Sequence, residues 1–176
     1  WRLLINTGHY AKCPRNACIC TMVAAQQTYP SMNEILNILV VDDDDVDRMA
    51  VRRYLGRAHF LAEIVEAEDA ARARDYLKRE SFDCIFLDYR LPDIDGLTLV
   101  TELRTEGIYV PIIVLTGQGD DQTAVKLMKA GASDYLPKSR LSADNLDSLI
   151  RQAIRVYQAE HKTRLAQAQL RQTNVV

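Results

Sequence analysis

Five short apolar runs alternate with amphipathic stretches between residues 36 and 158, and this alternation restricts the fold more than any other feature of the sequence. Apolar runs without polar interruptions, bounded by turn-forming residues, are typical of parallel strands that are buried on both faces. Five such strands with helices between them predict a doubly wound α/β sheet, and the flavodoxin-like order 2-1-3-4-5 is the default for five units. The expected strands are 38–41, 62–65, 84–87, 112–115 and 134–136.

The stretches between the strands repeat apolar residues at helical spacing, which predicts one buried face for each helix. The last helix has the clearest period, from Leu146 to Tyr157, and no glycine or proline follows before Asn174. We therefore expect an extended C-terminal helix whose residues 159–176 form a helical linker or tail capable of weak self-association. The faces expected in the four earlier helices are Val46, Met49, Ala50 and Tyr54; Ala70, Ala73 and Leu77; Leu99, Val100 and Leu103; and Val125 and Met128.

The segment before the alternating pattern has no clear period of its own. We expect residues 1–35 to form a poorly ordered leader or extension, and residues 36–158 to form the domain. Three cysteines and a histidine lie within the first 20 residues, but their spacing is not a recognised zinc pattern. Reduced thiols in a loosely ordered leader are therefore favoured over a structural metal site.

The charge balance and hydropathy exclude two classes of partner. With 22 basic and 24 acidic residues, the net charge is −2, which argues against a dedicated nucleic-acid binder. No apolar run approaches the roughly 18 residues that a membrane-spanning helix needs. We expect a cytoplasmic protein with neither a nucleic acid nor a membrane as partner.

The polar residues that end the apolar runs are expected to meet at one edge of the sheet, because the carboxyl ends of parallel strands share an edge. The first run ends in the four aspartates 42–45, the third in Asp88, and the fourth in Thr116, while the fifth leads into Lys138. Converging carboxylates repel one another unless a cation joins them. Oxygen ligands of this kind suit a hard divalent ion, most commonly Mg2+.

The four consecutive aspartates alone would be better explained by a solvated turn that caps the next helix, and it is Asp88 across the crevice that favours a metal site. We expect both interpretations to hold, with Asp44 or Asp45 capping the helix. Asp42 and Asp43 would then line the crevice opposite Asp88.

The residues expected at this edge have complementary chemistry. Beside Mg2+, the carboxylate of Asp88 stays ionised and can attack a phosphoryl group to give an acyl phosphate. Thr116 can donate a hydroxyl hydrogen bond to that group, and Lys138 can supply a positive charge. Taken alone, Thr116 would be an ordinary strand-end threonine and Lys138 an ordinary surface lysine. Together they are the parts that a phosphoryl-transfer site needs.

Over residues 36–158 the chain resembles a response regulator receiver domain, of the type attached to sensory or hybrid signalling proteins. The resemblance implies a phosphoacceptor in a two-component phosphorelay, which receives its phosphoryl group from a histidine kinase or phosphotransfer protein. Such a domain catalyses only its own phosphorylation and dephosphorylation, so we do not expect an enzyme. The segments that carry the resemblance are 38–43 (ILVVDD), 87–96 (LDYRLPDIDG), 114–117 (VLTG) and 131–138 (GASDYLPK).

The resemblance also implies roles for individual residues. Asp88 is the phosphoacceptor, and Thr116 and Lys138 bind the phosphoryl group. Tyr135 is the aromatic switch residue that acts with Thr116, and the switched face consists of the fourth helix, the fifth strand and the fifth helix. This face and the C-terminal helix are the two candidate surfaces for a homodimer. The implied metal ligands for Mg2+ are Asp43, Asp88, the main-chain carbonyl of Arg90, and Asp42 through a water molecule.

One position departs from the family pattern. Ser139 follows Lys138 where the family usually has a proline after a cis peptide bond. A cis bond before serine would cost about 3–4 kcal/mol. The loop after the last strand is therefore expected to run differently, which leaves the reach of Lys138 open.

The alternative from another class is a haloacid-dehalogenase-like phosphatase. Asp42 and Asp44 fit its Asp-x-Asp nucleophile motif, and residues 119–121 resemble its later metal motif. That fold normally needs a longer chain and gives Asp88 no role. A degenerate receiver used only for binding is disfavoured by the full set of acidic, threonine and lysine positions.

Overall fold

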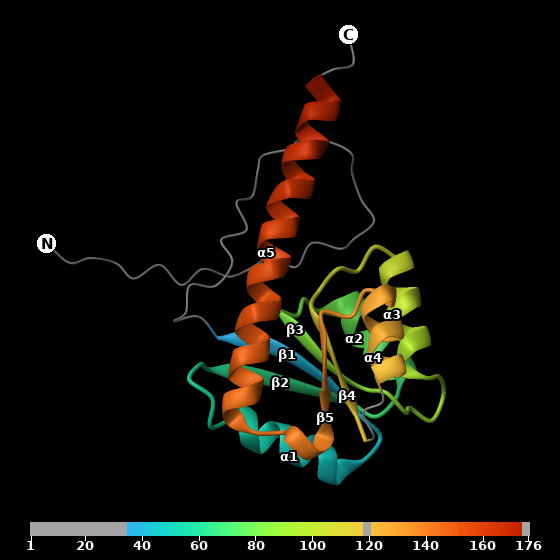
Figure 1. Ribbon diagram of the computed structural model, residues 1–176, viewed down its shortest axis with the longest axis vertical. Helices are drawn as coiled ribbons and strands as arrows, with labels where there is room; N and C mark the ends of the chain where they lie inside the picture. The colour runs from blue at the N-terminus through green and yellow to red at the C-terminus, as the bar shows by residue number, and fades with distance from the viewer. Residues whose placement is uncertain (1–34, 118–120, 174–176) are drawn as a thin grey trace, which may run out of the picture.

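The fold is a single parallel sheet in a computed structural model that describes residues 35–117 and 121–173 (Figure 1). The strand order is β2-β1-β3-β4-β5, and each neighbouring pair is parallel, as the sequence predicts. The expected leader lies outside the described residues except for its last residue. The strands are β1 (Leu36–Val41), β2 (Ala62–Ala67), β3 (Cys84–Asp88), β4 (Ile112–Thr116) and β5 (Asp134–Pro137).

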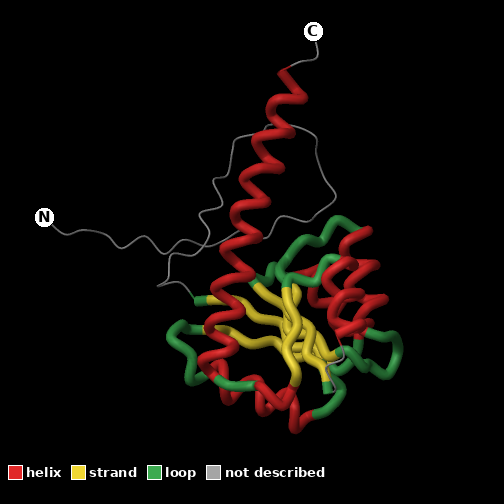
Figure 2. Tube along the Cα trace, in the orientation of Figure 1, coloured by secondary structure: helices red, strands yellow, loops and turns green. Residues whose placement is uncertain are grey.

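Helices cover both faces of the sheet, which lies in the centre of the domain (Figure 2). On one face lie α1 (Asp45–Leu55) and α5 (Ala143–Thr173). On the other face lie α2 (Ala70–Arg79), α3 (Gly96–Thr105) and α4 (Asp121–Ala130). A short 3-10 helix, η1 (Lys138–Arg140), joins β5 to α5.

The apolar runs are continuous because the central strands are covered on both sides. Successive side chains of a strand point to opposite faces. In β1, Leu39 and Val41 pack against the layer of α2, α3 and α4, whereas Ile38 and Val40 pack against α1 and α5. All four side chains are buried, so a polar residue at any of these positions would lose its contact with water.

The predicted helix faces are confirmed for α2, α3 and α5 and wrong for α4, while in α1 only Ala50 and Tyr54 are half-buried as expected. In α1, Val46 and Met49 are exposed, and Val51 and Leu55 are buried instead. In α4, the residues expected to be buried are likewise exposed, while Ala124 and Leu127 are covered. Apolar residues occur on two neighbouring faces of each of these helices. Only the position of the sheet decides which face it covers.

The C-terminal helix continues past the sheet to Thr173, as predicted (Figure 1). The helix packs on the core up to about Tyr157, but a residue beyond this point also contacts the domain. The guanidinium carbon of Arg164 lies 4.0 Å from the ring centre of Tyr109, in the segment between α3 and β4. No helix in the described ranges is long and apolar enough to cross a membrane.

The loop after β3 is tied to the start of α2 through Asp93. Its two carboxylate oxygens accept hydrogen bonds from the backbone N–H groups of Ala70 and Ala71, at 3.2 and 3.1 Å. Asp69 caps the same helix and accepts from the N–H of Arg72 at 2.6 Å. Desolvation acts to raise the pKa of Asp93, but these backbone hydrogen bonds outweigh it and lower the pKa below its usual value. The side chain of Asp93 thus acts as a second cap of α2 and holds the loop that follows Asp88 against the start of this helix.

Replacing Asp93 with alanine should lower the free energy of unfolding by about 1 kcal/mol at pH 7. A lowered pKa in the folded state gives stability that is present above the unfolded-state value of about 3.9 and lost as the pH falls through the folded-state value. The difference in free energy of unfolding between the variant and the unmodified chain should therefore shrink as the pH falls below about 4. Urea unfolding over this pH range tests it, with Asp75→Ala on the exposed side of α2 as the control. A difference that stays constant with pH would contradict the capping role.

Candidate functional site

The ends of four strands bring the predicted polar residues to one edge of the sheet. Asp42 follows β1, Asp88 ends β3, Thr116 ends β4, and Lys138 follows β5. Asp42, Asp88 and Thr116 are only 1%, 5% and 3% exposed, and they are the buried polar or charged residues of the described chain. Burying such groups is costly unless they find partners, so their collection at one edge marks this place as a site.

Three carboxylates form the acidic part of the site. Oxygen atoms of Asp42, Asp43 and Asp88 lie within 4.8 Å of one another. We call these three residues the acidic cluster. Asp44 is not part of it, because its side chain caps α1 and accepts from the N–H of Val46 at 2.8 Å. The expected division between crevice and cap is therefore the one that the structure shows.

The amine of Lys138 lies among these carboxylates. Its Nζ is 2.8 Å from Oδ2 of Asp42 and 2.8 Å from Oδ1 of Asp88. The described residues contain no cis peptide bond, and Lys138 begins η1. The lysine therefore reaches the acidic cluster although Ser139 follows it.

A third carboxylate, which the sequence analysis missed, also binds this amine. Oδ2 of Asp47 lies 2.6 Å from Nζ of Lys138. Asp47 is the third residue of α1, close to the cap at Asp44, and this position in the first turn was the only available signal. The lysine that it meets is 91 residues away in the chain, so the contact depends on the tertiary fold.

The electrostatics of the site reflect burial and crowding. Burial raises the pKa of Asp42, and the neighbouring charge of Asp88 adds to this, while hydrogen bonds from Lys138 and the N–H of Asp44 oppose it. Burial acts to lower the pKa of Lys138, but hydrogen bonds to Asp42, Asp47 and Asp88 outweigh it and raise the pKa above its ordinary value. The site holds four carboxylates, those of the acidic cluster and Asp47, but the lysine supplies a single ammonium. The surplus negative charge favours a further cation, and the donor set of carboxylate oxygens fits Mg2+.

Asp88 is held by the loop that follows it. The N–H of Arg90 donates to Oδ2 of Asp88 at 2.9 Å, which leaves Oδ1 to Lys138. The loop folds back so closely that a Cβ on Gly96 would lie 2.9 Å from the Asp88 carbonyl oxygen, and the N–H of Gly96 donates to Tyr89 at 2.8 Å. Glycine is required here by this close approach of two backbone segments. The role of the Arg90 carbonyl as a metal ligand stays a prediction.

Thr116 presents an unsatisfied group. Its buried Oγ1 has no hydrogen-bond partner among the residues that the structure describes. An unmet buried hydroxyl costs about 1–3 kcal/mol, so a ligand oxygen at this edge would be stabilised by it. Tyr135 lies half-buried on the neighbouring strand β5, opposite Val114 in register. Its role as a switch stays a prediction.

The phosphatase alternative is not supported. It would need Asp42 and Asp44 to act together as nucleophile and acid, but Asp44 turns its carboxylate to the helix N-terminus. Residues 119 and 120 of its second motif lie outside the described chain, and nothing is described of the Asp121 side chain. The five-stranded order 2-1-3-4-5 instead places Asp88 at the centre of the site.

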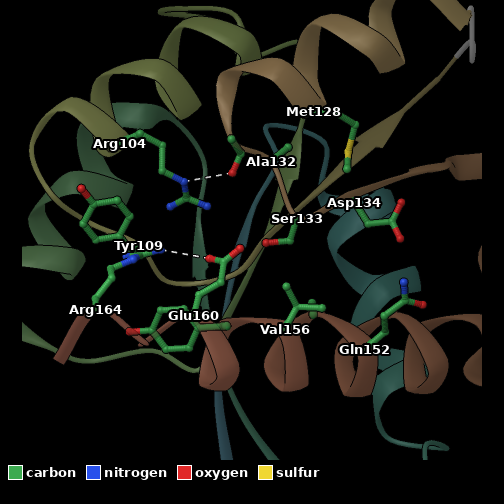
Figure 3. A pocket seen from close by; sticks show the side chains of 13 residues that line it. Arg104, Tyr109, Met128, Ala132, Ser133, Asp134, Gln152, Val156, Glu160 and Arg164 are labelled. Atoms are coloured by element: carbon green, nitrogen blue, oxygen red, sulfur yellow. Dashed lines mark hydrogen bonds and ion pairs between the residues drawn. The ribbon is translucent and has the colours of Figure 1, made fainter. Parts of the chain in front are cut away.

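A separate cavity of about 410 Å3 lies between α4, β5 and α5, and no member of the acidic cluster lines it (Figure 3). Met128 and Val156 stand on opposite walls, from α4 and α5. Arg104, Tyr109 and Arg164 gather at one end. The Nε of Arg104 donates to a backbone carbonyl at 2.9 Å, so this arginine is engaged in structure.

Comparisons with known proteins agree on one family. Residues 38–151 match the response regulator receiver domain. Protein PetR of Rhodobacter capsulatus is 40% identical over 102 residues, which cover 58% of this chain and 42% of PetR. The transcriptional regulatory protein SrrA of Staphylococcus aureus is 40% identical over 101 residues, which cover 57% of this chain and 41% of SrrA. The chain thus spans about two fifths of the length of these curated relatives.

Solved structures show the same fold. A response regulator receiver domain protein from Clostridium thermocellum superposes with a TM-score of 0.62 at 27% identity. The match covers 70% of this chain and 98% of that one.

Proposed function

Since the chain belongs to the response regulator receiver domain family, we propose that Asp88 takes up a phosphoryl group from a histidine kinase or phosphotransfer protein. The observation that carries this proposal is the environment of the Asp88 carboxylate. One oxygen is held by the N–H of Arg90 and the other by Lys138, with the acidic cluster and the unsatisfied hydroxyl of Thr116 beside it. A cytoplasmic location remains a prediction.

A divalent ion, Mg2+, is the cofactor that this site fits. We assign it to the carboxylates of Asp43 and Asp88 and the carbonyl of Arg90, with Asp42 acting through a water molecule. The basis is the acidic cluster, whose charge one lysine does not balance. When bound, the ion neutralises negative charge on the carboxylates and on the phosphoryl oxygens.

The protein's own residues then have distinct tasks in the transfer. A carboxylate oxygen of Asp88 forms a bond to phosphorus while the bond from phosphorus to the donor breaks, and the donor leaves with the bonding electrons. With acetyl phosphate the leaving group is acetate. Lys138 pairs with the transferred oxygens, and the hydroxyl of Thr116 donates to one of them, which satisfies the group left unpaired in the free site.

Incubation with acetyl phosphate and Mg2+ tests this function. Intact mass spectrometry should show a gain of one phosphoryl group per chain, and a chelator should prevent it. Continuous release of phosphate from simple phosphate esters, without a stable labelled species, would favour a phosphatase and contradict the proposal.

The phosphoryl state is expected to be sensed on the α4–β5–α5 face. Thr116 and Tyr135 lie on the adjacent strands β4 and β5, where a shift of one can be passed to the other. Three exposed apolar side chains lie on the covering helices of this face: Val125, Met128 and Val156. Met128 and Val156 of this apolar surface lie on either side of the cavity in Figure 3. The surface supports self-association of two copies there rather than through the C-terminal tail.

Sedimentation of the phosphorylated chain tests the choice of surface. Val125→Glu should shift the equilibrium toward monomer at least about tenfold, because it places a charge in an apolar interface. The matched control is Val46→Glu on α1, an exposed valine on a different face. A chain shortened after residue 158 should still associate. Loss of association only on shortening would assign it to the C-terminal helix instead.

A further inference from the structure

Lys138 has three N–H donors, and the structure gives each of them a carboxylate. The acceptors are Asp42 at 2.8 Å, Asp88 at 2.8 Å and Asp47 at 2.6 Å. The first two belong to the acidic cluster. Asp47 lies outside this cluster; it comes from α1, and its side chain is 33% exposed. The site therefore contains a carboxylate whose polar partner in the described part of the chain is the lysine alone.

A phosphoryl group on Asp88 needs the same donors. An ammonium has no N–H group left once three carboxylates are bound, so the phosphoryl oxygens must displace or share one of them. On becoming an acyl phosphate, Asp88 carries its negative charge on the phosphoryl oxygens, which take the place of its carboxylate at the lysine, and Asp42 can turn to the metal site. Asp47 has neither alternative and keeps a full negative charge beside the incoming anionic donor.

The neighbouring cation of α1 does not relieve this competition. Arg48 donates to the main-chain oxygen of Asp42 at 2.6 Å and forms ion pairs with Asp45 and Glu66. Its guanidinium is therefore committed to the start of α1 and to β2. Lys138 is the cation that Asp47 meets in the described part of the chain.

We propose that Asp47 is a positioning residue that holds the Lys138 amine on the α1 side of the site and competes with the phosphoryl group for it. The inference rests on the proposed function of Asp88. It implies that Asp47 slows phosphoryl uptake, because each transfer must break or weaken the contact between Asp47 and Lys138. Removing the carboxylate frees one N–H donor of Lys138 for the phosphoryl oxygens.

The rate of phosphoryl uptake from acetyl phosphate at saturating Mg2+ tests this competition. Asp47→Asn should raise the second-order rate constant at least about threefold, since a neutral amide oxygen holds the ammonium less strongly than a carboxylate does. The matched control is Asp45→Asn, which makes the same charge change two residues away. Asp45 is 80% exposed and pairs with Arg48 instead of Lys138, so its rate should stay within about 1.5-fold.

A double-mutant cycle shows whether Asp47 acts through the lysine. In a Lys138→Met background, Asp47→Asn should change the rate no more than Asp45→Asn does, because the contact is already gone. A purely structural effect would persist in that background. Asp47→Ala gives the same comparison without a side-chain amide and favours the helix by intrinsic propensity.

The two possible failures are distinguishable. Uptake by the unmodified chain with equal rates in Asp47→Asn and Asp45→Asn would overturn the positioning role alone. The positioning role would also be overturned if Asp47→Asn raised the rate of uptake equally with Lys138 and with Lys138→Met. No uptake by the unmodified chain would overturn the function of Asp88, and the positioning role with it.

Discussion

Replacing Asp88 with asparagine is expected to reduce phosphoryl uptake from acetyl phosphate to less than about one hundredth of that of the unmodified chain. An amide oxygen lacks the negative charge that makes the carboxylate a nucleophile. The side chain keeps its size, and an asparagine oxygen can still accept from the N–H of Arg90, so the loop after β3 should stay in place. Intact mass spectrometry measures the uptake, and peptide mapping locates it.

Folding must be separated from chemistry in this experiment. Asp88 is buried beside two other carboxylates, so removing its charge also removes repulsion and should leave the thermal midpoint equal or higher. Asp44→Asn is the matched control, because it removes a neighbouring charge while an amide oxygen can still cap α1. Undiminished labelling of the Asp88→Asn chain would show that another residue accepts the phosphoryl group.

Loss of the Asp43 side chain is expected to weaken Mg2+ binding at least about tenfold, whereas Asp44→Ala and Asp45→Ala should weaken it less than about threefold. Asp43 offers a carboxylate oxygen to the acidic cluster, but the other two face the helix N-terminus and Arg48. Removing a direct oxygen ligand removes both charge and coordination, which a nearby exposed charge does not supply. Isothermal titration with Mg2+ measures the three affinities.

The capping residue gives this experiment an internal contrast. Asp44→Ala should lower the free energy of unfolding by about 1 kcal/mol through loss of the helix cap while leaving the metal affinity nearly unchanged. Asp43→Ala should show the opposite pattern. Equal losses of affinity at all three positions would mean that Mg2+ responds to the general charge of this segment instead of a defined ligand set.

The sequence alone determined the sheet, its order and most of the site. A strand buried on both faces needs an unbroken apolar run, so each run and its polar end are visible in the chain. The carboxyl ends of parallel strands share one edge, so Asp42, Asp88, Thr116 and Lys138 were expected together although their strands are far apart in sequence. Local motifs around these residues also sufficed to indicate the family.

The tertiary structure decided which side of each helix is covered and which residue meets which partner. Val46 and Met49 have helical spacing and are still exposed, because two faces of α1 carry apolar residues and the sheet covers only one. Asp47 meets Lys138, and Arg164 meets Tyr109, across distances in the chain that no local pattern spans. Periodicity describes one element at a time. The rotation of a helix on the sheet, and the side chains it presents to other elements, follow from the packing of all layers together.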